Sequence, residues 1–77
     1  MNNERRKELR RAVAMLEEAR SMVMETRSQE EDAMENMPES MHYNSERWEA
    51  AEEALNQMDT ADGAIEEAVE ALGEINL

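Results

Sequence analysis

Small and apolar residues recur at three- and four-residue steps through the first half of the chain. This spacing lines one face of an α-helix and predicts a helix from about residue 3 to about residue 37. The positions are Leu9, Ala12, Val13, Leu16, Ala19, Val23, Thr26, Ala33, Met34 and Met37. The segment is rich in strong helix formers and contains no Gly or Pro before Pro38. Glu30 falls on the stripe, so we expect the helix to fray there, Glu30 to face a polar partner, or Glu30 to mark a site.

A turn is predicted after the first helix. Pro38 disfavours helical geometry at Met37 and lacks a backbone donor, so residues 38–44 should form this turn. Asn44 or Ser45 then offers a side-chain oxygen that can cap a second helix.

The second helix is predicted from about residue 45 to about residue 73, with Gly73 as its C-cap. Its apolar stripe is Trp48, Ala51, Leu55, Met58, Ala61, Ile65, Ala68, Val69, Leu72 and Ile75. Asp62 and Gly63 interrupt this helix midway. One interpretation is a weak point that costs about 1 kcal/mol. The other is a close helix approach or a kink at an interface.

These two helices predict an all-α fold in which two long antiparallel helices form one helical-hairpin domain over residues 1–77. Their lengths, about 50 and 45 Å at ~1.5 Å per residue, match well enough for one hairpin. Two helices alone leave each apolar stripe covered on one side only. We therefore expect a homo-oligomer, a dimer or higher, that completes a helical bundle.

Composition narrows the function classes. The chain has no Cys, which removes thiol catalysis, disulfides and Cys-based zinc sites. No apolar run approaches the roughly 20 residues of a membrane span, and the first residues lack the apolar region of a signal peptide. We expect a cytoplasmic protein that binds neither membrane nor, at a net charge of −12, nucleic acid.

The negative charge is concentrated in the second part of the chain. Residues 1–27 contain seven basic and five acidic residues, whereas residues 28–77 contain one basic and fifteen acidic residues. A line of carboxylates can imitate the phosphates of a duplex towards a basic groove. The candidate partner-binding carboxylates are Glu52, Glu53, Glu66 and Glu67. The alternative is a solvated face that keeps the bundle in solution.

Five basic residues gather near the start of the first helix: Arg5, Arg6, Lys7, Arg10 and Arg11. If oligomerisation brings several such clusters together, Arg5, Arg6, Arg10 and Arg47 are candidate phosphate-binding residues. The alternative is pairing with Glu4 and Glu8 and with Glu70 and Glu74 of the antiparallel helix.

Flexible and aromatic side chains surround the predicted turn. Met37, Met41, Tyr43 and Trp48, with Met34 beside them, suit an adaptable protein interface, and Trp48 is the candidate hot spot. Alternatively, Trp48 plugs the end of the bundle.

Metal chemistry and catalysis have little basis in this sequence. Glu39 and His42 have the Glu-x-x-His spacing of di-iron bundles, but they lie beside Pro38 in the turn rather than on a regular helix, so we expect no metal and no cofactor. One His and no Cys leave no nucleophile–base pair. We expect a non-enzyme with no catalytic residues.

A family resemblance is carried by the segment from Ser28 to Met41, SQEEDAMENMPESM, followed by Ser45-Glu-Arg47 and the Glu-Ala repeats of the second helix. It resembles a group of short helical proteins encoded by phages and prophages of Gram-positive bacteria, mostly without assigned function. The turn from residue 36 to residue 41 is the specific part. Met37 and Met41 stand where Leu is usual in that group, and neither Trp48 nor His42 belongs to its pattern.

The resemblance implies a function in countering host defence, since many short phage proteins bind a defence protein or sequester its nucleotide signal. A weaker similarity, at Ser45-Glu-Arg47 and Thr60-Ala-Asp62, is to helical-hairpin sponges that capture cyclic nucleotides. Those proteins have a Trp-Ala-Asn-like segment, and this chain has Thr60 in the place of that Trp. Three hypotheses follow. They are an anti-CRISPR- or anti-restriction-like inhibitor with an acidic surface, a nucleotide sponge, and a purely structural assembly bundle.

Overall fold

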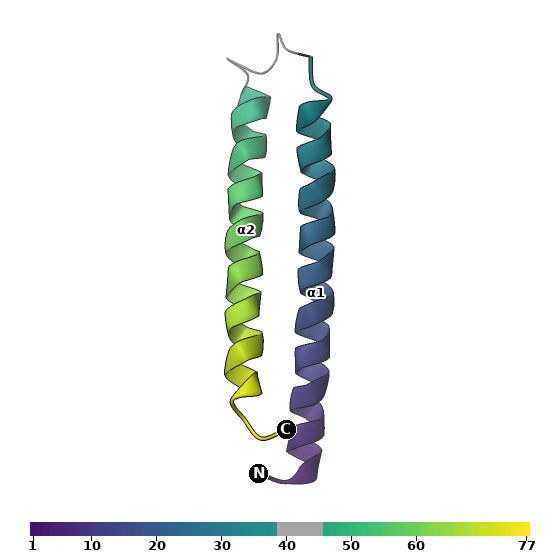
Figure 1. Ribbon diagram of the computed structural model, residues 1–77, viewed down its shortest axis with the longest axis vertical. Helices are drawn as coiled ribbons and strands as arrows, with labels where there is room; N and C mark the ends of the chain where they lie inside the picture. Colours follow the sequence, from purple (N-terminus) through teal and green to yellow (C-terminus); the bar gives the residue numbers. More distant parts are fainter. Residues whose placement is uncertain (39–45) are drawn as a thin grey trace.

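The computed structural model describes residues 1–38 and 46–77, which form two helices, α1 (Asn3–Glu35) and α2 (Glu46–Gly73). The helices run antiparallel and pack against each other, with both chain ends at one end of the hairpin (Figure 1). This arrangement confirms the predicted all-α hairpin. No helix in the described ranges is long and apolar enough to cross a membrane.

Helix α1 begins and ends with identifiable caps. The side-chain oxygen of Asn2 accepts a hydrogen bond from the Arg5 backbone N–H at 2.9 Å, which satisfies one of the free donors of the first turn. The helix ends at Glu35, two residues before the predicted end. The Met37 N–H then bonds to the Met34 carbonyl in a tighter turn, because Pro38 disfavours helical geometry at the residue before it.

Helix α2 ends at Gly73, as predicted, but without the expected glycine cap. No glycine of the chain has a positive φ, so Gly73 does not adopt the left-handed conformation of such a cap. Instead, the N–H groups of Glu74 and Ile75 bond three residues back, to the carbonyls of Ala71 and Leu72. The predicted caps of this helix at its other end, Asn44 and Ser45, lie outside the described residues.

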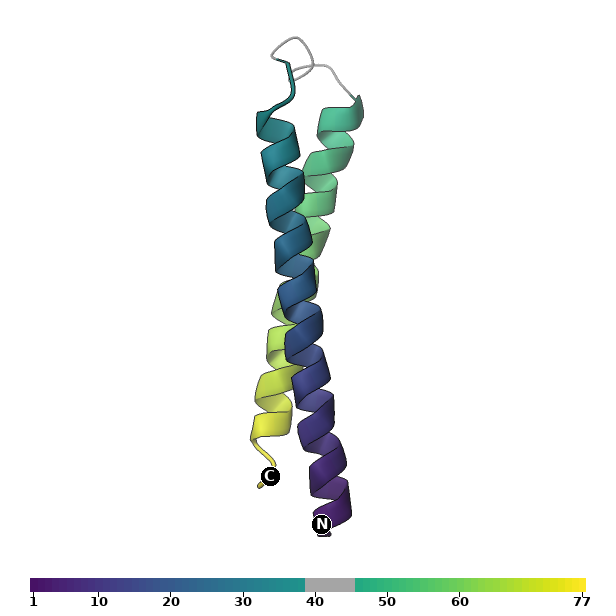
Figure 2. The same cartoon turned by 90° about the vertical axis from the view of Figure 1, so that its right-hand side faces the viewer.

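The molecule is a thin rod of 60 × 15 × 13 Å whose helices cross at a shallow angle (Figure 2). Its radius of gyration is 17.6 Å, whereas a compact chain of this length has about 11.5 Å. It exposes 5991 Å², against about 4,800 Å² for a compact chain. Met34 and Ala51 are the only buried apolar residues in the described part of the chain.

The seam between the helices follows a seven-residue repeat on α1. The positions that follow this repeat are all buried or partly buried, and they are Leu9, Val13, Leu16, Arg20, Val23, Arg27, Glu30, Met34 and, just after the helix, Met37. Arg6, Ala12 and Ala19 are partly buried as well. The predicted stripe was therefore wrong at two positions, because Thr26 and Ala33 are exposed. Arg20 and Arg27 occupy seam positions that a search for apolar residues passes over. Glu30 is partly buried, as a residue on the stripe should be.

The stripe of α2 was predicted correctly and gains one charged member. All ten predicted residues are buried or partly buried, and Asp62 joins them between Met58 and Ile65. An added Cβ at Gly63 would meet nothing within 4 Å. The close helix approach considered at Gly63 is thus not present between α1 and α2 within the described residues.

Candidate binding surfaces

Two ion-pair clusters hold one side of the seam. The guanidinium of Arg20 reaches across to Asp62 and, at 3.2 Å, to Glu66. Arg27 bonds to Asp59 of α2 and to Glu31 of its own helix. As the residue number rises from 20 to 27 on α1, that of the α2 aspartate falls from 62 to 59, so these pairs mark the antiparallel register.

The same contacts raise the pKa of both arginines. The hydrogen bond to Asp62 raises the pKa of Arg20, and burial offsets only part of this increase. For Arg27, the hydrogen bonds to Asp59 and then to Glu31 raise the pKa. Two cations are therefore committed to the side of the hairpin where α2 presents Asp59 and Glu66.

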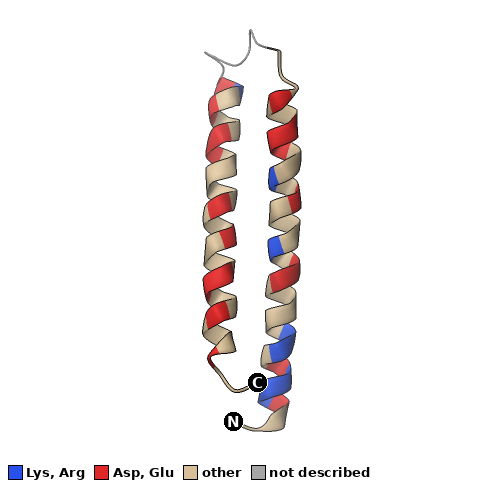
Figure 3. Cartoon of the chain, viewed as in Figure 1, with Lys and Arg blue, Asp and Glu red and all other residues tan. Residues whose placement is uncertain are grey.

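The outer surface of α2 is strongly acidic. Of its 28 residues, nine are acidic and Arg47 is the single basic one. In Figure 3 red runs along the length of α2, while blue gathers near the start of α1. At about 100° per residue, five exposed glutamates share an arc of about 100°. One of them, Glu52, accepts a hydrogen bond from Trp48, and the other four have no ion pair with a described residue. We call this set the acidic face: Glu49, Glu53, Glu67 and Glu70.

The structure divides the four predicted partner-binding carboxylates into two kinds. Glu53 and Glu67 are exposed members of the acidic face, and neither has an ion-pair partner among the described residues. Glu66 instead pairs with Arg20. Glu52 accepts a hydrogen bond from the Trp48 indole N–H at 2.7 Å. Only the first two are free for an external partner without breaking a contact within the hairpin.

The basic end of α1 contacts the last residues of the chain. Arg6 Nε–H donates to the Asn76 carbonyl at 3.0 Å, and Arg10 donates to the Leu77 carbonyl at 2.7 Å. Arg11 pairs with Glu8, as one of the two interpretations expected. The expected pairing with Glu70 and Glu74 is not found within the described residues.

The four candidate phosphate-binding residues are not brought together within one hairpin. Arg5, Arg6 and Arg10 lie in the first turns of α1, at the end of the rod where the chain begins and ends. Arg47 is the second residue of α2, at the opposite end. A single hairpin therefore offers no joint phosphate site from these residues.

The turn cluster is only partly described. Met34 is buried, and Met37 and Trp48 are partly buried at the turn end of the seam. The other two predicted members, Met41 and Tyr43, lie outside the described residues, as do Glu39 and His42. Among the residues that the structure does describe, no group of three His, Cys, Asp or Glu side chains is placed to hold a metal ion.

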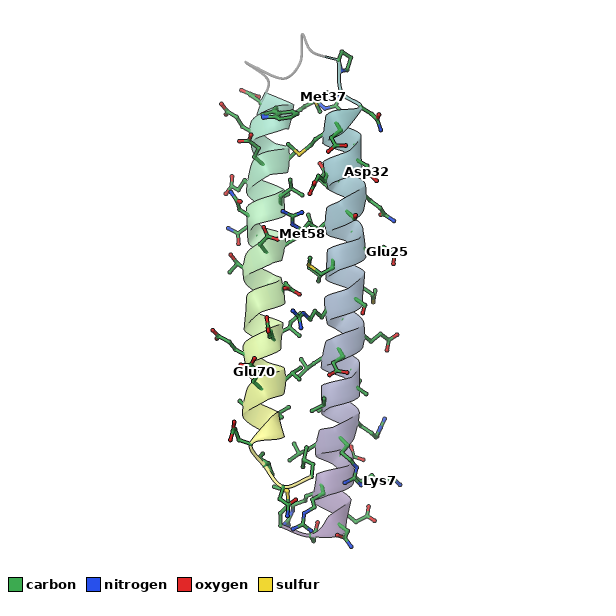
Figure 4. All side chains as sticks on the ribbon, viewed as in Figure 1. Lys7, Glu25, Asp32, Met37, Met58 and Glu70 are labelled. Carbon is green, nitrogen blue, oxygen red and sulfur yellow. The ribbon has the colours of Figure 1, made fainter. Side chains whose placement is uncertain are left out.

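The side of the hairpin away from the ion pairs is apolar. Met15 and Met22, seven residues apart on α1, are 65% and 63% exposed. Beside them an open hollow of about 350 Å³ is lined by Met22, Val23, Thr26 and Met58. In Figure 4 Met58 points towards α1, whereas Glu25 points away from α2.

Alanines extend this surface on both helices. Ala12 and Ala19 precede Thr26 at seven-residue intervals on α1, and Ala54, Ala61 and Ala68 repeat at the same interval on α2. Ala61 is about 160° from Asp59 around the α2 axis, and Met22 is about 160° from Arg20 around the α1 axis. We call this surface the apolar face; it comprises Ala12, Met15, Ala19, Met22 and Thr26 of α1 with Ala54, Ala61 and Ala68 of α2.

The sequence analysis placed five members of this face in the predicted stripes but left out Met15, Met22 and Ala54, because it sought one stripe per helix. The spacing of Met15 and Met22, seven residues apart and parallel to the row of Ala12 and Ala19, was the available signal.

Comparisons of this chain with protein families, curated proteins and solved structures give no match.

Proposed function

We propose that this chain is a non-enzymatic phage protein that acts in the host cytoplasm and blocks a host defence component through the acidic face. Its target is a basic groove that normally binds nucleic acid. The observation that carries the proposal is the row of exposed carboxylates on α2, Glu49, Glu53, Glu67 and Glu70, which have no ion-pair partner within the described residues.

The spacing of charge defines what the acidic face can engage. Its four carboxylates span Glu49 to Glu70, about 32 Å of helix axis, which gives about one carboxylate per 10 Å. One strand of B-DNA carries a phosphate per about 3.4 Å. The acidic face therefore offers about one charge for every third phosphate, and it would engage a subset of the Lys and Arg side chains of a basic groove. A rigid helix also holds its charges in place before binding, which lowers the entropy cost of association.

The two arginines that point into the seam leave the acidic face without a compensating charge. Arg20 and Arg27 point to the seam and neutralise Asp59, Asp62 and Glu66 there. None of the acidic-face glutamates has its charge compensated by these two arginines. The field outside α2 therefore stays negative, which favours encounter with a basic groove and makes binding strongly dependent on salt.

The test is a DNA-cleavage assay with purified host nucleases, one RNA-guided and one of the restriction type. The protein should inhibit at least one of them, and added duplex DNA should compete for the inhibited enzyme. The double variant Glu53→Lys/Glu67→Lys reverses two charges of the acidic face without touching a described ion pair. It should lose inhibition by a factor of about 100 or more, because each of two close charge contacts contributes about 1.5 kcal/mol or more.

The matched control is Glu18→Lys/Glu25→Lys, which makes the same change in net charge on the outer side of α1. It should inhibit within a few-fold of the wild type. Equal loss in both variants, at unchanged helicity, would show that net charge and not the acidic face matters. Full inhibition by Glu53→Lys/Glu67→Lys would contradict the proposal.

The alternatives have less support from the geometry. A nucleotide sponge would use Arg6 and Arg10, but these donors already bond to carbonyls of Asn76 and Leu77, and Arg47 lies at the other end of the rod. A purely structural bundle would use the apolar face and gives the acidic face no function beyond solvation.

A further inference from the structure

The apolar face is only partly covered in the hairpin: its alanines Ala12, Ala19, Ala61 and Ala68 are partly buried, while its methionines are exposed. Met15 and Met22 are about two-thirds exposed, and the hollow that Met22 lines with Val23, Thr26 and Met58 opens to solvent. Single exposed apolar side chains are ordinary, but a continuous apolar face along a row of alanines is typical of an interaction surface. The alanines also let another helix approach closely, because their side chains are short.

We propose that the apolar face binds a second copy of this chain in an antiparallel, two-fold symmetric dimer that forms a four-helix bundle. This inference does not depend on the proposed function, since the acidic face and the apolar face are separate. Glu67 is about 120° from Ala61 around the α2 axis, so the second copy leaves the acidic faces of both chains exposed.

The amount of surface fits a dimer. The chain exposes about 1,200 Å² more than a compact chain of its length. A standard stable interface removes about 600–1,000 Å² from each partner. Binding of one second copy through an interface of this size would therefore cover most of the excess exposed surface. A third copy is not required to cover it.

The position of the face suits two-fold symmetry. Ala19 and Met22 lie near the middle of α1, and Ala61 lies near the middle of α2. A two-fold axis through this region sets the same patch of both chains against itself, as a closed dimer requires.

Charge selects the antiparallel orientation. Residues 21–61, which make up the half of the rod towards the turn, contain two basic and eleven acidic residues, a net charge of −9. The remaining residues contain six basic and nine acidic residues, a net charge of −3. A parallel dimer would place the two −9 halves together. The antiparallel dimer sets each of them beside the half that carries Arg5, Arg6, Lys7, Arg10 and Arg11, so repulsion is lower.

The first experiment is sedimentation equilibrium of the full chain at concentrations up to about 0.1 mM, where even a modest dimer would be populated. The wild type should sediment as two chains of 8.9 kDa each. Met15→Gln/Met22→Gln removes the two exposed apolar side chains of the face without changing its charge. Its dissociation constant should rise by a factor of at least about ten.

The matched control is Met24→Gln, because Met24 is an exposed methionine on the same helix that lies about 160° away from Met22. It should leave the dissociation constant unchanged, and circular dichroism should report the same helicity for all three proteins. A wild type that stays a single chain, as it would if the face served a different protein, would overturn the inference. So would a dimer that is insensitive to Met15→Gln/Met22→Gln.

The orientation has its own measurement, because a chain without Cys accepts a single spin label. In Glu4→Cys the label sits in the first turn of α1. The antiparallel dimer places the two labels at a separation close to the 60 Å length of the rod, whereas a parallel dimer holds them within about twice its 15 Å width. The short separation, measured by pulsed electron paramagnetic resonance, would overturn the antiparallel arrangement.

Discussion

At the scale of single residues, the seam is unusual in placing charged side chains at positions where helix pairs normally bury apolar ones. The Asp62 side chain is 18% exposed and Arg20 is 39% exposed, so their pair is neither at the surface nor fully withdrawn from water. Such a pair adds little net stability, because desolvation offsets the attraction. A polar pair in a helix seam is better suited to fixing register, since slipping by one turn would separate its members.

Arg20→Leu should therefore destabilise the hairpin, because Asp62 would keep its partly buried charge without a partner. We expect the melting temperature Tm to fall by about 5 °C. In Arg20→Leu/Asp62→Leu no such charge is left, and Tm should return to the wild-type value or exceed it. Thermal unfolding followed by circular dichroism measures both effects.

Arg11→Leu is the control for this pair of variants. It breaks the Glu8–Arg11 contact, whose side chains are about two-thirds exposed, and exposed pairs of this kind contribute little. Its Tm should match that of the wild type. If the double variant melts as low as Arg20→Leu alone, the pair stabilises the hairpin directly and the argument from desolvation is wrong.

Residue-level prediction from the sequence succeeded where hydrophobicity and position agree and failed where they conflict. Leu16 and Val23 were identified because they are apolar and lie in the seam. Arg27 was passed over in favour of Thr26, since the stripe was chosen from small and apolar residues. The long aliphatic part of Arg can line a seam while its charged end reaches a carboxylate, and the sequence does not show which carboxylate of α2 lies opposite.

At the scale of the element, α2 has three sectors, two of which share an edge. The acidic face lies on its own part of the circumference, whereas the row of Ala54, Ala61 and Ala68 borders the seam, where Ala61 and Ala68 are partly buried. The sequence predicted the helix and its ends well, because Pro38 and the three- and four-residue spacing are local signals. It placed Ala61 and Ala68 on the stripe but not Ala54, since Ala is compatible with the core, with solvent and with an interface.

Gly63 lies in the interior of α2 with a helical backbone and open space around its missing side chain. Gly63→Ala should therefore stabilise the protein by about 0.5–1 kcal/mol, since Ala loses less backbone freedom on folding. The expected rise in Tm is about 4 °C or more. Unfolding by a chemical denaturant should likewise give a higher free energy of unfolding for Gly63→Ala than for the wild type.

Gly73→Ala serves as the comparison for this variant. An added Cβ also meets nothing there, but the position is the last residue of the helix, where fewer helical bonds depend on it. Its effect should be clearly smaller. A lower Tm for Gly63→Ala would instead point to a neighbour that packs against this glycine in an assembled state.

At the scale of the whole molecule, a net charge of −12 is held on a rod only 15 Å wide. At about 0.01 M salt the screening length is about 30 Å, so the excess negative charges in one cross-section repel each other. At about 0.5 M salt it falls below 10 Å and this repulsion is largely removed. The charged groups of the ion pairs across the seam are in direct contact, so salt weakens their attraction less than it weakens the repulsion between more distant charges.

We therefore expect Tm to rise by several degrees when salt is increased from about 0.01 M to about 0.5 M at neutral pH. The variant Glu53→Gln/Glu67→Gln, with two fewer charges on the acidic face, should show a smaller rise and a higher Tm at low salt. A Tm that falls as salt increases would mean that attraction between Arg20, Arg27 and their partners outweighs the repulsion.

Both chain ends of the hairpin lie together, opposite the turn (Figure 1). A force that pulls these ends apart would separate the helices progressively from this end towards the turn. The contacts between the helices would therefore break one after another rather than together. The order is set by the contacts already described: Arg6 with Asn76 first, then Arg20 with Asp62, and Arg27 with Asp59 last. Each step breaks only a few contacts that bury little surface. The hairpin would therefore unfold gradually, at a low pulling force.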